Sequence, residues 1–243
     1  MATSYKTIST NVRDYDFSKP VQSSRGRGKN VYVKTRDGNP FMVQFSVNME
    51  DSCLVFVPEP YDDAQVGGRR TMLVNGENGR AEFARAFDDM LLQATSEHCE
   101  EWFGRKISSE ALKDLMSGIT AVSRDKEKYP IDSIKVKYDP GRTEILTTTG
   151  KKDENGNLEV QRGGKFEDLG KSFRGILAVS GFMWFQSAKF GFSMTVDTMI
   201  VHPRNGTIAP EKKFNFGVVV KEEDPTTANG KRKALGDEQE NDE

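Results

Sequence analysis

Aromatic and basic side chains are interleaved in the last third of the chain, where four large apolar residues run together at 182–185. Aromatic rings can stack on the bases of a single-stranded nucleic acid, at about 1–3 kcal/mol per base, while nearby cations contact its phosphates. The run lacks alternation and is expected to connect two strands, so a packed core and a base-stacking platform both remain open. The candidate base-contacting residues are Arg174, Phe182, Trp184, Phe185 and Lys189.

Two further groups of cations could follow a phosphate backbone. Lys135 and Lys137 fall on one face of a predicted strand whose other face is apolar, and a solvated outer face is the alternative interpretation. The second group lies in the Gly- and Ser-rich segment before residue 31, which is expected to be a mobile basic loop. It contains Arg25, Arg27 and Lys29.

The same search finds little that could support catalysis or metal binding. The chain has two histidines, His98 and His202, and two cysteines, Cys53 and Cys99, which are too few for a predicted metal site. The glycine-containing stretch at 26–30 lacks the spacing of a phosphate-binding loop. We therefore expect a protein that is not an enzyme and that uses no metal or cofactor.

The charge of the 243-residue chain is unevenly distributed, although the formal net charge is only −2. Residues 221–243 contain eight acidic and four basic side chains, so this segment carries −4 and the remainder +2. It has no aromatic residue and one large aliphatic residue, Leu235, which predicts a disordered acidic tail. Our hypothesis is that the tail competes with nucleic acid for the basic surface and recruits replication proteins.

Several features indicate an intracellular protein. No apolar stretch approaches the ~18 residues of a membrane-spanning helix. Residues 1–16 contain no apolar segment typical of a secretory signal. Two cysteines in a chain of this length do not form a disulfide framework, which fits a reducing compartment. No association with a membrane is expected.

The periodicity predicts a mainly β (α+β) fold with inserted helices. Period-two alternation indicates strands near 41–49, 134–138 and 190–200. Helical spacing replaces it at about 80–120, where one apolar face is lined by Phe83, Phe87, Met90, Leu91 and Ala94. An OB-like barrel is the favoured architecture, with a jelly-roll-type sandwich as the alternative, because alternation alone does not separate them.

We expect three parts along the chain. Residues 1–30 form a flexible basic segment, and residues 31–220 form a single OB-like β domain with the helical insertion at about 80–120. Residues 221–243 form the acidic tail.

Two blocks of the sequence resemble the single-stranded DNA-binding proteins of nucleocytoplasmic large DNA viruses. The first block runs from Trp102-Phe103-Gly104-Arg105-Lys106 through 108–116 to Tyr129-Pro130 and the strand at 134–137. The second is the pair of segments 175–185 and 189–201, with an aromatic-rich turn followed by Lys-Phe-Gly and an alternating strand. That family is akin to the OB-fold single-stranded DNA-binding proteins of short-tailed phages.

The resemblance implies base-contacting roles for Trp184, Phe185 and Lys189, extending to Arg174, and structural roles for Trp102 and Tyr129. The phage-type acidic tail ends in an aromatic residue, whereas this chain ends in Asn-Asp-Glu at 241–243, which puts docking of partners through the tail in doubt.

The resulting prediction is sequence-tolerant binding and protection of single-stranded DNA in viral DNA replication, recombination or repair. The expected location is the host nucleus or a cytoplasmic viral replication site, and a homo-oligomer is compatible with it. The alternative is a structural or virion β-sandwich protein without nucleic-acid activity.

Overall fold

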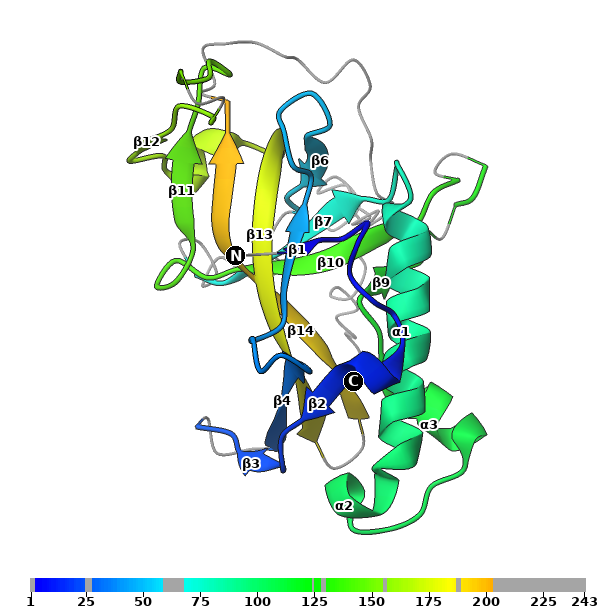
Figure 1. Ribbon diagram of the computed structural model, residues 1–243. Helices are drawn as coiled ribbons and strands as arrows, with labels where there is room; N and C mark the ends of the chain where they lie inside the picture. The colour runs from blue at the N-terminus through cyan, green and yellow to red at the C-terminus, as the bar shows by residue number, and fades with distance from the viewer. Residues whose placement is uncertain are drawn as a thin grey trace, which may run out of the picture.

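A computed structural model describes residues 3–24, 28–58, 68–123, 125–127, 130–154, 157–186 and 189–202 (Figure 1). Arg25, Arg27, Tyr129 and the predicted acidic tail at 221–243 lie outside the described residues.

Five strands close into a barrel, which confirms the predicted OB-like architecture and not the sandwich alternative. Four neighbouring pairs are antiparallel, and the ring is closed by one parallel contact between Lys137 and Thr195. The barrel strands, in their order around the ring, are β6 (Cys53–Phe56), β7 (Arg70–Asn75), β10 (Ser133–Tyr138), β14 (Lys189–Val201) and β13 (Ser172–Gln186).

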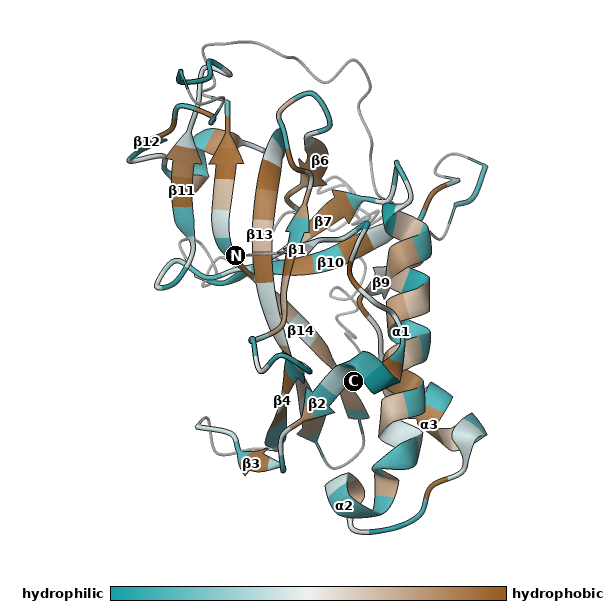
Figure 2. Ribbon diagram, in the orientation of Figure 1, coloured by the Kyte–Doolittle hydropathy of each residue, from teal (hydrophilic) through white to brown (hydrophobic). Residues whose placement is uncertain are grey.

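Alternation along these strands fills the barrel with apolar side chains, because every second residue points inward. Figure 2 shows apolar residues concentrated on the barrel strands and hydrophilic residues in the connections. The fully buried interior residues include Val55, Met72, Val74, Ile134, Val136, Leu177, Val179 and Val196.

The β13–β14 hairpin extends beyond the barrel, and at its turn end further strands continue the same sheet in a region that we call the lower sheet. There β13 pairs with β4, and β14 pairs with β8, while β4 also pairs with β2 and β3. Figure 1 shows the two long strands running from the barrel into this lower sheet. Its additional strands are β2 (Tyr15–Phe17), β3 (Val21–Gln22), β4 (Lys29–Thr35) and β8 (Met116–Ser117).

Shorter strands extend the edges. β5 pairs with the middle of β13 and with β1, β9 pairs with β10, and β11 links β14 to β12. Their bounds are β1 (Thr3–Ser4), β5 (Met42–Phe45), β9 (Thr120–Ala121), β11 (Glu144–Thr147) and β12 (Gln161–Arg162).

The helices lie between β7 and β10 in the chain, as the change of period predicts. They are α1 (Arg80–Glu97), α2 (Cys99–Phe103) and α3 (Ser109–Leu115), and they occupy one side of the molecule (Figure 1). The predicted apolar face of α1 is buried, and Phe87 packs against Phe41 and Phe192 at centroid distances of 5.1 Å. Ser108 caps α3 by accepting a hydrogen bond from the backbone N–H of Ala111.

Two expectations need correction. Residues 3–24 are not a flexible extension, because Tyr5, Val12 and Tyr15 are buried in the core and β2 and β3 pair with β4. Residues 182–185 do not form a connection but belong to the strand β13. The alternation is hidden there because both faces of the sheet carry large apolar side chains.

Candidate nucleic-acid interface

Three aromatic side chains share the outer face of the lower sheet. Tyr32 on β4 lies directly opposite Phe182 on β13, and Trp184 is two residues further along β13. Directly opposed residues in antiparallel strands project to the same side, as do residues two apart in one strand. We call Tyr32, Phe182 and Trp184 the aromatic face.

The aromatic face is accessible to a ligand. Tyr32 is 48% exposed, Phe182 and Trp184 are half-buried, and the Tyr32 and Phe182 rings lie 6.0 Å apart. Val21 on β3, opposite Asn30, adds an apolar side chain that is 51% exposed. Rings on paired strands lose little further freedom when they bind, so this surface is suited to stacking on planar ligands.

Gly191 gives the Trp184 indole room to lie against the sheet. It is the β14 residue opposite Trp184, and a Cβ atom there would come within 3.0 Å of the indole Cζ2 atom. The same Cβ would lie 2.3 Å from the carbonyl oxygen of Ser117 on β8. The glycine therefore permits both the close pairing of β8 and the position of the indole.

Phe185 does not belong to the aromatic face, which corrects the expectation that it contacts bases. Alternation turns it inward, and it is 4% exposed. Its ring packs against Trp102, Phe103 and Phe190 at centroid distances of 5.3, 5.3 and 5.9 Å. Its role in this structure is to support the sheet from the core side.

Arg174 is also separated from the aromatic face. It lies on the barrel end of β13, eight residues before Phe182, which corresponds to roughly 25 Å along an extended strand. Its Nη1 atom donates a hydrogen bond to the backbone oxygen of Ser52 at 3.1 Å. The structure therefore gives Arg174 a partner in the barrel wall and does not place it with the other candidates.

Two lysines flank the aromatic face. Lys189 is exposed at the start of β14 and alternates with inward-facing Phe190, so it shares the side of Trp184. Lys34 is exposed on β4, two residues after Tyr32. Lys29 is exposed as well, but it is paired with Phe185 and falls on the opposite side by alternation.

Lys135 and Lys137 lie on the outer wall of the barrel, as the alternation predicts, because Val136 between them points inward. Lys137 pairs with Thr195 on β14. Thr195 lies two residues after Ser193, which is the β14 residue opposite Phe182. Burial lowers the pKa of both lysines; nearby Asp88 opposes this shift at Lys135, and nearby Arg69 adds to it at Lys137.

The cations on this surface are available for a ligand. Within the part of the chain that the structure describes, no carboxylate lies within 4.0 Å of the amino groups of Lys34, Lys135, Lys137 and Lys189. Sequence reasoning missed Tyr32 and Lys34. The alternation at 30–34 was the available signal, since it places both side chains opposite buried Val31 and Val33.

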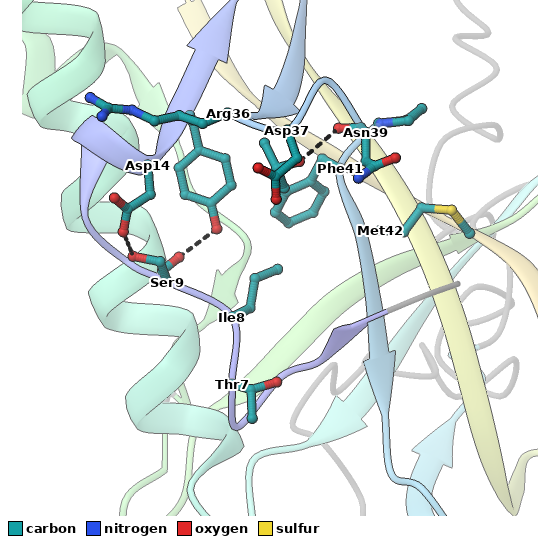
Figure 3. A pocket seen from close by; sticks show the side chains of 12 residues that line it. Thr7, Ile8, Ser9, Asp14, Arg36, Asp37, Asn39, Phe41 and Met42 are labelled. Atoms are coloured by element: carbon teal, nitrogen blue, oxygen red, sulfur yellow. Dashed lines mark hydrogen bonds between the residues drawn. The ribbon is translucent and has the colours of Figure 1, made fainter.

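A cavity of about 420 Å³ lies elsewhere, between the N-terminal segment and the β4–β5 connection (Figure 3). Two hydrogen bonds join residues of its lining: Ser9 Oγ donates to Asp14 Oδ2, and the Tyr15 hydroxyl donates to the Ser9 backbone oxygen, both at 2.5 Å. Burial, assisted by Asp14, raises the pKa of Tyr15 to about 12, so the phenol stays protonated. These hydrogen bonds stabilise the N-terminal segment.

Cys53 and His98, two further side chains of reactive types, both contact neighbouring groups. Burial raises the pKa of the Cys53 thiol to about 12, and its Sγ donates to the Gly175 oxygen at 3.0 Å. The His98 ring stacks on Trp102 with a centroid distance of 4.8 Å. The described ranges contain no group of three or more His, Cys, Asp or Glu side chains that could hold a metal ion. No helix within them is long and apolar enough to cross a membrane.

Comparison with known proteins finds low similarity, to solved structures. No family model matches the sequence, and no curated protein matches it. Among solved structures, the single-stranded DNA-binding protein from bacteriophage Enc34 is similar with a TM-score of 0.43 and 9% sequence identity, over 83% of this chain and 96% of that chain.

Two further structures of that phage protein give similar values. A C-terminal truncation has a TM-score of 0.42 and 9% identity, over 76% of this chain and 95% of that chain. The complex with single-stranded DNA has a TM-score of 0.41 and 9% identity, over 82% of this chain and 99% of that chain. At this level of similarity, it stays a prediction that the chain belongs to the single-stranded DNA-binding proteins of large DNA viruses.

Proposed function

We propose that the chain binds single-stranded DNA without strong base preference. The observation that carries this proposal is the aromatic face, with Lys34 and Lys189 beside it and Lys137 one strand away on the same outer surface. Stacking supplies affinity for any base because every base has a π-face, while the lysines supply contacts to phosphates. Duplex DNA keeps its bases stacked on each other and is therefore the weaker ligand.

We further propose that the chain acts by binding and not by catalysis. Supporting this, Cys53 and Tyr15 both have raised pKa values, which disfavour nucleophilic roles. The biological setting is proposed from the sequence resemblance: protection of single strands during viral DNA replication, recombination or repair, in the host nucleus or a cytoplasmic replication site. We also propose that the acidic tail binds replication proteins and that the chain associates with itself.

A titration of fluorescently labelled oligo-dT at several salt concentrations tests this proposal. We expect saturable binding that weakens as salt rises, since phosphate contacts release counterions. Replacing Lys135 and Lys137 together with glutamine should reduce the slope of log K against log salt by about 1.4, at about 0.7 per contact to a single strand.

A matched control replaces two exposed lysines near β11 and β12, Lys151 and Lys152, with glutamine. This variant carries the same charge change and should keep at least most of the wild-type slope. Absence of binding by the wild-type chain, or an affinity independent of salt, would rule out the proposed function. A structural protein without nucleic-acid activity would give the first of these results.

A further inference from the structure

The turn between β10 and β11 brings an arginine onto the outer surface of the β13–β14 hairpin. Arg142 Nε donates to Asp197 Oδ1 at 2.7 Å, and Nη2 donates to Ser180 Oγ at 2.6 Å. The turn itself is fixed, because Thr143 Oγ1 donates to the Val196 oxygen at 2.7 Å and the Arg142 N–H donates to the Asp139 oxygen at 2.9 Å. The guanidinium is thus held at a defined position.

A β-bulge supplies the carboxylate that orients this arginine. In the β13–β14 ladder Val179 pairs with Val196 and Ala178 pairs with Thr198, so Asp197 is the extra residue between them. A bulge redirects the side chain at an irregular point in a sheet and is frequent next to functional sites. Here it places the Asp197 carboxylate against Arg142 Nε.

The position of Arg142 lies between the aromatic face and the barrel lysines. Its partner Ser180 is two residues before Phe182 on β13, about 7 Å along the strand. Ser180 is also opposite Thr195, whose other neighbour is Lys137. A single-stranded DNA whose bases stack on the aromatic face and whose backbone continues toward Lys137 must pass Arg142.

We propose that Arg142 binds a phosphate of the single strand at this position, and that Asp197 is the residue that positions it. A guanidinium carries five N–H donors, and the two hydrogen bonds leave three for a ligand within the described structure. The Arg142 side chain is 51% exposed. Arginine suits this task because its fixed planar fork matches the geometry of phosphate oxygens.

The inference rests on the proposed function, and binding of oligo-dT by Arg142 variants tests it. Arg142→Ala should bind roughly 10-fold more weakly than wild type, since a hydrogen bond between charged groups is lost. Its salt slope should fall by about 0.7. Arg142→Lys should keep the slope but recover only part of the affinity, because lysine retains the charge and lacks the fork.

A matched control is Arg162→Ala, which also removes an exposed arginine from an ion pair, here with Glu144 at 2.9 Å on the β11–β12 edge. It should bind as wild type does. Exposed ion pairs contribute about 0–1 kcal/mol to stability, so thermal unfolding should show both alanine variants folded. If Arg142→Ala fails to fold, the affinity of Arg142→Lys for oligo-dT still tests the inference, and a reduced affinity supports it.

If the wild-type chain binds oligo-dT and Arg142→Ala binds it with the same affinity and the same salt slope, this inference is overturned while the proposed function stands. Arg142→Lys that binds as tightly as wild type would overturn the role of the fork. Failure of the wild-type chain to bind any oligo-dT would overturn the proposed function and this inference together.

Discussion

Replacing Tyr32 and Trp184 together with alanine should weaken binding to oligo-dT by about a hundredfold or more. Each stacked base contributes about 1–3 kcal/mol, and every ~1.4 kcal/mol corresponds to a tenfold change in affinity. Both side chains lie on the outer face, so their loss removes stacking area without opening a cavity in the barrel. Fluorescence anisotropy of a labelled oligonucleotide at low salt measures the effect.

Conservative variants separate stacking from stability. Tyr32→Phe and Trp184→Phe keep an aromatic face at each position and should retain most of the wild-type affinity. Val160→Ala removes an exposed apolar side chain next to β12, outside the proposed site, and should have no effect. Wild-type affinity in the double alanine variant would show that bases do not stack on this face.

Asp132→Asn should destabilise the fold at neutral pH by about 1–2 kcal/mol. Asp132 is 4% exposed and joins the segment before β10 to α1. It accepts hydrogen bonds from the Lys126 amino group, from the Ser123 N–H at 3.0 Å and from Arg85 Nη2 at 2.8 Å. Burial alone would raise the Asp132 pKa, but these donors outweigh it and lower the pKa to about 2.

The sign of the pH dependence follows from that shift. Because the folded-state pKa lies below the ordinary value of 3.8, the ionised form stabilises the fold at neutral pH. This stability is lost as pH falls from about 5 toward 2, so the difference between wild type and Asp132→Asn should shrink in acid. Urea unfolding at several pH values measures it, with the exposed Asp168→Asn as control. A constant or growing difference in acid would contradict the assignment.

The local pattern of apolar and polar residues was sufficient to predict the helices and strands that have one apolar and one polar face. The helical face that includes Phe83 and Phe87 and the alternation of Phe190 and Phe192 both correspond to buried residues. Such patterns report which side of an element meets the core, and this information lies within a few residues of sequence.

The closure of the barrel could not be read in this way. It depends on one parallel contact between Lys137 and Thr195, residues from distant parts of the chain. Nothing in the local sequence of either strand indicates its partner, so alternation alone did not separate the favoured barrel from the sandwich alternative. Alternation at 30–34 indicates that Tyr32 lies on an outer face, but no local signal predicts its pairing with Phe182, which belongs to a strand far along the chain.

The candidate site was therefore predicted in part. Trp184, Phe182 and Lys189 share one outer surface, whereas Phe185 points inward because it is adjacent to Trp184 in the same strand. Arg142 gave no signal because its position depends on a β-bulge that only the register of β13 and β14 reveals.

Trp184 reports directly on binding of a single strand to the aromatic face when it is the only tryptophan in the chain. The chain has two, and Trp102 is 2% exposed in the core, where phenylalanine is a conservative replacement. In the Trp102→Phe variant, oligo-dT should quench the Trp184 emission in a saturable manner, with the same midpoint as binding measured by anisotropy, because the indole stacks on a base. Binding without any change in Trp184 emission, or no binding, would contradict the claim that this face holds the single strand.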